Sequence, residues 1–363
     1  MKQKKEITFL GVTLGVLMMI AASLLALSYL SVFVNPTKFW FMSVFGLLYI
    51  PLVLLNVFLL VIALIHKSVK ALIALFILFP SVFLFGLYYR CPDKSANADK
   101  MEEVKGNVKL ISYNVGRFSL SSKELKMGSM KNCFDSVMRF LVSKKADIIC
   151  LQEFASCSAD KIRNSFEKYF PGYDIEYYVY TNAKGCYGNV ILSRFPLKRK
   201  NKLSFERSSN LAISCDYDIY GTILRIYNCH FQSYNISLAR IAKSFRNKEI
   251  LMDTEERMKK AIVLRPKQVD MVVKDIENSP VESIVTGDFN DTPISYTYNR
   301  LSYNRKDAFV EAGSGFGGTY SFFLPILRID YILFPKRYNA TSWKIDKVKY
   351  SDHFPITAEL DIN

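Results

Sequence analysis

Two short polar runs near the end of the chain carry side chains suited to acid/base chemistry, and each follows a strand-like stretch. The first run, SIVTGDFND, places Asp288 and Asn290 directly after β-branched residues. The second run, YSDHFPI, contains Asp352 and His353. The ends of strands are where α/β scaffolds present their reactive groups. These four side chains are therefore the first candidates for a site.

Four further residues extend this set, because each lies at the end of a strand-like run or within one. Asn114 ends KLISYN, Glu153 ends DIICLQE, and His230 follows IYNC. Hard cations such as Mg²⁺ prefer carboxylate oxygens like those of glutamate. Asp330 lies inside RIDYIL, where a charge costs free energy unless it is paired, so we expect a partner such as His353. Singly, each residue has an ordinary structural interpretation; together they indicate metal-assisted hydrolysis of a phosphate ester.

Short strand patterns with few helices between them must position these side chains. Apolar and β-branched runs predict strands at residues 108–114, 147–151, 189–193, 223–230, 283–286, 329–334 and 357–360. Helical patterns cover residues 129–144 and 255–277, and Pro266 should kink the second helix or start a new one. Many strands and few helices favour an α/β fold in which sheet packs on sheet with helices outside.

The N-terminal part of the chain holds three long apolar runs. Charged residues are absent from residues 7–37, 39–65 and 71–89. A membrane-spanning helix needs about 20 mostly apolar residues and tolerates proline, so each run is long enough. A signal peptide would supply only one apolar region of about 7–15 residues. We therefore expect three transmembrane helices before the α/β domain.

The positions of the lysines predict how these helices are oriented. Three lysines precede the first run and two separate the second from the third, whereas Lys38 stands alone between the first and second. The positive-inside rule then puts the N-terminus in the cytoplasm and the domain outside it. We expect a three-helix membrane anchor at residues 1–90, a linker at 91–106 and a catalytic domain at 107–363. The expected localisation is the cell membrane, as a multi-pass protein.

The chain is basic, with 48 Lys and Arg against 33 Asp and Glu and a net charge of +15. Nine basic and three acidic residues fall in residues 1–100, a net of +6, which leaves +9 for the remainder. This charge suits anionic partners such as nucleic acid, phospholipid headgroups or small phosphate esters, and equally lysines solvated near an anionic membrane. The seven cysteines contain no C-x-x-C pair, which disfavours a zinc site and leaves disulfide formation open.

From about Val108 onward the chain resembles the endonuclease/exonuclease/phosphatase superfamily of DNase I-like enzymes. The resemblance rests on six motifs in order: SYNV, LQE, the strand end at His230, GDFND, RIDYIL and SDHFP. It implies a four-layer sandwich of two mixed β-sheets flanked by helices. It also implies a hydrolase that acts on phosphate-ester bonds and depends on Mg²⁺ or Mn²⁺.

The resemblance implies roles on the metal side of the site. Asn114, Glu153 and Asp352 resemble the metal-side ligands, and Glu153 resembles the principal one. His230 resembles the histidine that contacts the scissile phosphate or serves as an acid. No other cofactor is implied.

The same resemblance implies roles in the chemical step. Asp288 resembles the group that activates water, and Asn290 resembles its neighbour that holds the phosphate. Asp330 and His353 resemble an Asp–His pair, in which the carboxylate holds the tautomer and orientation of the imidazole.

The chain departs from the usual pattern of this family in two respects, an extra basic segment and the lack of recognisable DNA-contacting loops. A basic stretch at residues 237–260 lies between His230 and GDFND, and it is either a substrate-recognition lobe or a solvated helix. The loop GSGFGG at residues 313–318 is too loose in pattern to be a phosphate cradle. The loops that abasic-site endonucleases use to contact DNA are not identifiable.

Several functions remain open from the residues. The substrate is a nucleic acid, a phospholipid headgroup or a small phosphate ester, cleaved as a diester or a monoester. A nuclease would bind with strong salt dependence, whereas a lipid enzyme would favour a bilayer-presented substrate. A membrane-tethered, non-catalytic binding module for anionic phosphate ligands is the alternative. A transporter is disfavoured, because uncharged spans offer no ion pathway. The oligomeric state is unknown.

Overall fold

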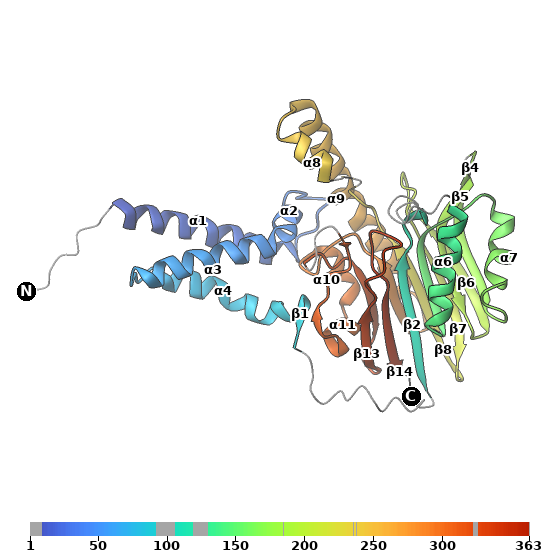
Figure 1. Cartoon of the computed structure of the whole chain (residues 1–363). Helices are drawn as coiled ribbons and strands as arrows, with labels where there is room; N and C mark the ends of the chain where they lie inside the picture. The colour runs from blue at the N-terminus through green and yellow to red at the C-terminus, as the bar shows by residue number, and fades with distance from the viewer. Residues whose placement is uncertain are drawn as a thin grey trace, which may run out of the picture.

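The computed structural model describes residues 9–91, 106–118, 130–183, 185–234, 236, 238–321 and 326–362. A β-rich body holds the C-terminal part of the chain, and the N-terminal helices extend away from it as an elongated bundle (Figure 1). The expected linker at residues 91–106 lies almost entirely outside the described residues.

The first of two six-stranded sheets has the strand order β13-β14-β2-β3-β5-β4. Its strands are β2 (Asn107–Asn114), β3 (Ile148–Ser156), β4 (Asp174–Asn182), β5 (Gly185–Ser193), β13 (Asn339–Ile345) and β14 (Ile356–Asp361). β2 and β3 pair in parallel and the other neighbours pair antiparallel. The sheet is therefore mixed, and its parallel pair lies at the centre.

The second sheet has the order β10-β12-β9-β8-β7-β6. Its strands are β6 (Leu197–Ser204), β7 (Leu211–Ile219), β8 (Thr222–His230), β9 (Ser283–Asp288), β10 (Arg305–Asp307) and β12 (Asp330–Pro335). Again one central pair, β8 and β9, is parallel and the remaining pairs are antiparallel. β2, β8 and β9 end at residues of the six motifs, and β3 contains the LQE motif.

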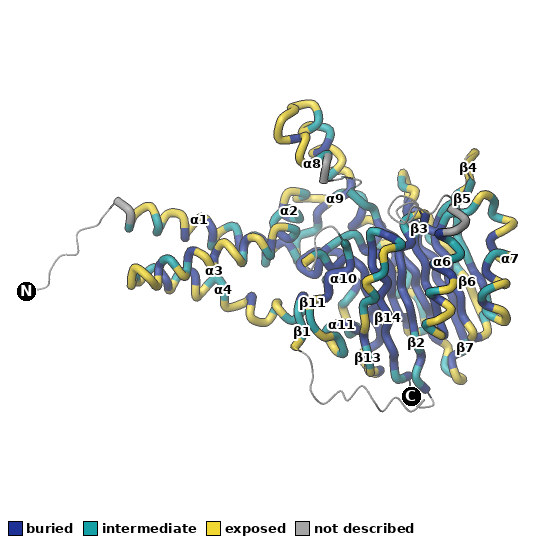
Figure 2. Tube along the Cα trace, viewed as in Figure 1, coloured by how far each residue is buried: buried dark blue, intermediate teal, exposed yellow. Residues whose placement is uncertain are grey.

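Three hydrophobic clusters define four layers. Between the sheets, residues such as Leu110 and Ile213 pack together. The outer face of the first sheet is covered by α6 (Met130–Ser143) and α7 (Ile162–Glu167). The outer face of the second is covered by α9 (Lys248–Glu277) and α10 (Tyr296–Ser302). Figure 2 shows the strands as the most buried part of the molecule. The expected sandwich of two mixed sheets flanked by helices is confirmed.

Short elements complete the body: η2 (Gly116–Phe118), η3 (Ala159–Lys161), α8 (Leu238–Ser244), α11 (Ala308–Ala312) and β11 (Gly315–Phe316). The sequence patterns do not predict β4, β6, β7 or β13. Pro266 lies inside α9 and does not start a new helix. α9 begins earlier than expected because the Asn247 side chain accepts a hydrogen bond from the Ile250 N–H and caps the helix. All seven cysteines are free.

The apolar runs form α1 (Phe9–Ser31), α2 (Met42–Leu47), α3 (Tyr49–Ile65), α4 (Ala71–Leu84) and η1 (Phe85–Leu87). Among the described residues, only the helix at Gly11–Ser31 is long and apolar enough to cross a membrane. The expectation of three such helices is therefore not met. The second run is interrupted at Leu48, and α3 has 17 residues, a rise of about 25 Å against a hydrocarbon core of roughly 30 Å. The third run contains Pro80 and ends in a 3₁₀ turn.

The apolar helices dock on the β-rich body. The short strand β1 (Tyr89–Arg90) pairs antiparallel with β11. The Leu87 carbonyl accepts a hydrogen bond of 3.0 Å from Arg328 Nε. At Gly46 in α2, a Cβ would lie 2.4 Å from the Ile294 carbonyl oxygen, so only glycine permits this approach. Ile294 itself is buried among residues of α1, α3 and the Tyr88 ring.

Arg328 is the main polar link at this contact, and replacing it with methionine should destabilise the protein by about 3–5 kcal/mol. Its guanidinium is buried and Nη1 lies 2.7 Å from Asp307 Oδ2, so the substitution leaves a buried carboxylate without its cation. Thermal melts of the full chain in mild detergent would measure the loss. The double variant Arg328→Met/Asp307→Asn should recover part of it, and no recovery would contradict the ion-pair explanation.

Candidate functional site

Three of the expected site residues form one row across the second sheet. His230 is the last residue of β8 and lies beside Asp288, the last residue of β9. Asp288 in turn lies opposite Asp330, the first residue of β12. All three side chains are buried. The row exists because two parallel strands end at the same edge, where the antiparallel β12 begins.

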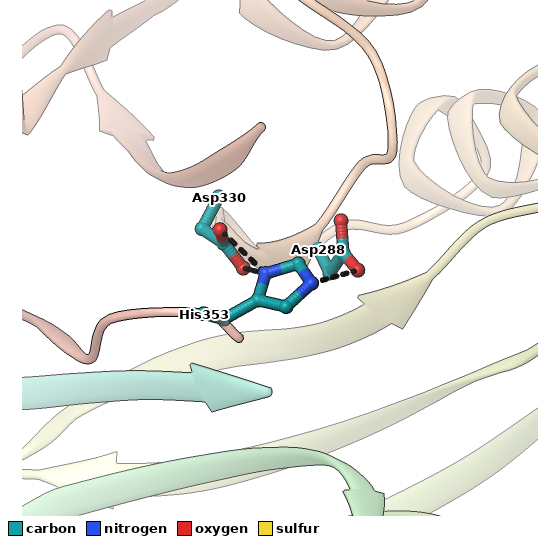
Figure 3. Close-up of side chains that lie close together, drawn as sticks. All are labelled: Asp288, Asp330 and His353. Atoms are coloured by element: carbon teal, nitrogen blue, oxygen red, sulfur yellow. Dashed lines mark hydrogen bonds and ion pairs between the residues drawn. The ribbon is translucent and has the colours of Figure 1, made fainter. Parts of the chain in front are cut away.

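His353 completes the group from the loop before β14. Its Nδ1 lies 3.0 Å from Asp330 Oδ2, and its Nε2 lies 3.7 Å from Asp288 Oδ2. Figure 3 shows the imidazole held between the two carboxylates. The expected pairing of Asp330 with His353 is thus present. The Phe354 N–H, in the same loop, donates to the Thr319 carbonyl at 2.8 Å and holds the loop in place.

The first sheet contributes Asn114 and Glu153. Asn114 ends β2, and its Nδ2 donates to Asp288 Oδ2 at 2.9 Å and to Glu153 Oε1 at 3.5 Å. Glu153 lies where the β3–β5 register shifts, with φ +50°. A bulge at this point breaks the alternation of side chains along the strand, and it turns the Glu153 side chain toward the site. His230 Nε2 is 3.5 Å from Glu153 Oε1, so the two sheets meet at these groups.

The GDFND turn holds Asn290 against Asp288. The Asn290 backbone N–H donates to Asp288 Oδ1 at 2.8 Å, and its Nδ2 donates to Asp288 Oδ2 at 3.0 Å. Asn290 Nδ2 also donates to the Phe231 carbonyl, beside the end of β8. Gly287 has φ +129°, and a Cβ there would lie 2.0 Å from the Cys229 carbonyl oxygen. This glycine is therefore required for the close pairing of β8 and β9.

Asp352 lies at the margin of the group. Its Oδ1 accepts a hydrogen bond from Ser351 Oγ at 3.2 Å. Gly116 follows β2, and a Cβ there would be 3.3 Å from Asp352 Oδ1. The Gly116 N–H donates to Asn114 Oδ1 at 3.0 Å. Asp352 thus borders the turn that holds Asn114.

Burial and neighbouring charge shift the pKa values within the group. Burial raises the pKa of Asp288 to about 6, against the lowering effect of His353. Burial alone would lower the pKa of His353, but Asp330 and Asp288 raise it to about 10. For Glu153 burial acts upward, yet His230 and Arg117 lower its pKa overall. At neutral pH the site therefore contains an ionised Glu153, a protonated His353 and a carboxyl at Asp288 that titrates near neutrality.

The donor set fits a hard divalent cation on the Glu153 side. Glu153 has a lowered pKa and is partly exposed, and the Asn114 amide lies beside it, with Nδ2 3.5 Å from Glu153 Oε1. Within the part of the chain that the structure describes, His230 Nε2 is buried without a hydrogen-bond partner. Asp288, Asp330 and His353 also lie with ligand atoms within 4.8 Å of one another. The Glu153 carboxylate is more exposed than the buried carboxylates of Asp288 and Asp330, which makes the Glu153 side more accessible to a cation.

Two residues beside the site, one next to Glu153 and one next to His353, are not predicted from the sequence. Arg117 Nε lies 3.4 Å from Glu153 Oε2, and its guanidinium lies 4.6 Å from the centre of the Tyr187 ring. Arg117 has φ +55° in the turn after β2. Arg117 lies three residues after Asn114, and this closeness to the SYN motif is the one feature of the sequence that points to it. Tyr320, whose ring centre lies 5.1 Å from that of His353, had no such signal.

Substituting Asp330 with asparagine should make stability less dependent on His353 protonation. The folded pKa of His353, about 10, exceeds its ordinary value of 6.5, so protonation of the ring stabilises the fold. That contribution is full below pH 6.5 and is lost as the pH rises toward 10. The difference in melting temperature between the unsubstituted protein and Asp330→Asn should therefore be largest below pH 6.5. A difference independent of pH would contradict the pairing; Asp218→Asn, remote on β7, is the control.

The comparisons with known proteins agree with this geometry. Residues 11–88 match a domain of unknown function (DUF8431), and no curated protein sequence matches the chain. The solved structure of an endonuclease/exonuclease/phosphatase family protein from Leptotrichia buccalis is 19% identical to this chain, with a TM-score of 0.50. The match covers 69% of this chain and 98% of that protein. One from Bacteroides vulgatus is also 19% identical, with TM-score 0.52 and coverages of 71% and 100%. The human Nocturnin catalytic domain with bound sulfate is 16% identical, with TM-score 0.51 and coverages of 71% and 94%.

The solved structures establish the fold, and the family model establishes the relationship. The model of the Endonuclease/Exonuclease/phosphatase family matches residues 111–353, more than half of the chain. This range begins in β2 and ends at His353, so it contains every site residue described above. The chain belongs to the endonuclease/exonuclease/phosphatase family.

Proposed function

We propose that the chain is a divalent-metal-dependent phosphoesterase that hydrolyses a phosphodiester or phosphomonoester by attack of water. The family's members are generally metal-dependent phosphoesterases. The observation that carries the proposal is the convergence of Asn114, Glu153, His230, Asp288 and His353 where the two sheets meet. Groups brought together from strands far apart in sequence, several with shifted pKa values, are typical of catalytic sites.

Asp288 is the proposed general base. Its pKa of about 6 is close to the pH at which a base works best, and Asn114 and Asn290 fix the direction of its carboxylate. The protonated His353 lies against it and is suited to offset charge on the phosphoryl oxygens. Asp330 holds the His353 ring through Nδ1. His230, with Nε2 directed between Glu153 and Asp288, would contact the phosphate or protonate the leaving group.

Glu153 and Asn114 are the proposed holders of Mg²⁺ or Mn²⁺, with Asp352 at the margin. When bound, such an ion would polarise the phosphoryl group and neutralise developing charge. His230 and Arg117 beside Glu153 lower its pKa and keep that carboxylate ionised. The residues of the chain therefore separate into a metal side and a base side, joined by the amide of Asn114.

We also propose that the N-terminal helices anchor the enzyme in a membrane. α1 is long and apolar enough to span a bilayer, and α3 and α4 pack against it. Their outward-facing side chains are apolar, including Phe58, Phe76 and Val82, which is the reverse of a soluble surface. With α1 spanning and its N-terminus in the cytoplasm, the catalytic body would face outward, and the substrates would be envelope or membrane phosphates. Nucleic acid is the other substrate class.

The test is a hydrolysis panel with the full chain in detergent or nanodiscs. DNA, RNA, sphingomyelin and phosphoinositides would be offered with Mg²⁺, with Mn²⁺ and with a chelator. We expect hydrolysis of at least one class that the chelator abolishes and added metal restores. Binding of a phosphate ligand without turnover in any metal would favour the non-catalytic binding module instead.

A further inference from the structure

The hairpin formed by α8 and α9 projects from the catalytic body and is strongly exposed at its tip. Figure 1 draws the base of the hairpin beside α2 and its tip pointing away from the body, crosswise to the apolar helices, and Figure 2 shows the tip exposed. The hairpin has a defined shape: Asp253 in α9 pairs with Arg240 in α8 and lies 2.8 Å from Arg257 Nε. Asn247 caps α9 at the turn. These ion pairs and the helix cap thus give the tip a defined conformation.

The tip combines apolar and basic side chains. Phe245 is 83% exposed, Met252 61% and Leu251 49%. Exposed basic residues surround them, namely Lys243, Arg246 and Lys248, against one acidic residue, Glu249. Exposure of these apolar side chains to water is unfavourable, and burying them in the interfacial region of a bilayer would stabilise them. The basic residues beside them suit anionic lipid headgroups. A nucleic acid partner would account for the charge but not for the two exposed aliphatic side chains.

The position of the hairpin agrees with such a surface. Lys259 lies with Nζ 5.7 Å from the centre of the Trp40 ring, in the segment that joins α1 to α2. Met252 is seven residues before Lys259 and so lies on the same face of α9, two turns nearer the tip. Phe39 and Phe41 flank Trp40 and are exposed. Aromatic residues at the end of an apolar helix are typical of the membrane–water boundary.

We propose that the tip, Lys243–Met252, inserts into the headgroup region of an anionic bilayer beside the apolar helices. This inference rests on the membrane anchoring proposed above. The other end of the hairpin is tied to the site: Arg265 in α9 donates to the Gln232 carbonyl, two residues after His230, and pairs with Asp291 of the GDFND turn. Arg265 lies thirteen residues after Met252 on the same helix, a rise of about 20 Å, so a seated tip would tether the catalytic site near the lipid surface, which favours a phosphate ester presented by a bilayer.

The test measures the depth of single fluorophores in reconstituted full chain. Cys91 and Cys157, the two exposed cysteines, are first replaced with serine. An environment-sensitive label is then placed at Phe245→Cys, and nitroxide lipids in phosphatidylserine/phosphatidylcholine vesicles act as quencher. Tyr220→Cys, 64% exposed in the distant β7–β8 turn, is the matched control for a site away from lipid. Met19→Cys, 60% exposed in α1, reports insertion of the anchor.

We expect a label at residue 245 to be quenched at least about twofold more than one at residue 220. Triple reversal of Lys243, Arg246 and Lys248 to glutamate, or phosphatidylcholine alone, should remove most of this difference. If the label at residue 19 is quenched but the label at residue 245 is quenched no more than the control at residue 220, the tip does not insert. The inference would then be wrong, although the membrane anchoring would be supported. Absence of quenching at 19 would overturn the anchoring itself. A response at 245 to an oligonucleotide, without quenching by lipid, would assign the tip to nucleic acid.

Discussion

Replacing Asp288 with asparagine should lower kcat by about a thousandfold or more while leaving the fold intact. The variant removes the proposed base, and a positioned acid/base group contributes roughly 10²–10⁴-fold. Asparagine keeps the shape of the side chain, and its amide oxygen can still accept from Asn114 and Asn290. Because burial already raises the pKa of Asp288 to about 6, a neutral side chain should not destabilise the fold. kcat on whichever panel substrate is cleaved, with a thermal melt alongside, measures both expectations.

The matched control is Asp218→Asn. Asp218 lies in the same sheet, near the far end of β7, where its carboxylate pairs with Lys198 at the surface. Its substitution should leave kcat within about twofold, since a surface ion pair contributes little. Near-normal turnover by the Asp288 variant would remove this residue from the chemistry. A collapse of its melting temperature would mean that the site requires the charge for folding.

The strand ends of the site could be predicted from the sequence because they combine two simple signals. A β-branched run shows where a strand ends, and a polar residue at that point lies at the edge of a sheet. Asp288 and His230 were found in this way, and the structure puts them side by side. The pairing of Asp330 with His353 followed from the cost of an unpaired buried charge.

Other features could not be predicted, because they arise from long-range packing. β6 reads LKRKNKLS, and β7 contains a buried Asp216 that pairs with Arg225 on β8. Neither run looks like a strand until its neighbours are known. The positive φ of Glu153 arises from a bulge against β5, which no local pattern indicates. Arg117 reaches Glu153 through a turn whose course depends on the packed sheets.

The number of membrane-spanning helices at the N-terminus could not be predicted from composition alone. Counting uncharged residues predicts three spans, but helix length depends on where the backbone is interrupted. Leu48 separates α2 from α3, so one apolar run yields two helices. The docking of α2 on Ile294, four residues after Asn290, was also not evident. This contact connects the apolar helices to the loop that follows the GDFND turn.

Replacing Glu153 with glutamine should weaken divalent-metal binding by about 100-fold or more. Loss of groups that merely orient ligands already costs about 10–100-fold, and Glu153 would supply the charge that attracts the ion. His230 and Arg117 lower its pKa, so the unsubstituted carboxylate is ionised throughout the working pH range, and glutamine removes that charge at every pH. Mn²⁺ binding, followed by electron paramagnetic resonance, measures the loss without requiring turnover.

The activity of the Glu153 variant separates a metal role from a structural one. If Glu153 holds the ion, the Mg²⁺ concentration for half-maximal kcat/KM should rise in parallel with the loss of Mn²⁺ binding, and high metal should partly restore turnover. If Glu153 only pairs with Arg117, metal dependence would be unchanged and the melting temperature would fall slightly, as for other partly exposed ion pairs. Glu167→Gln, at the exposed end of α7, should change neither quantity. Unaltered Mn²⁺ affinity in the Glu153 variant would move the metal site toward Asp352 or the Asp288–Asp330 pair.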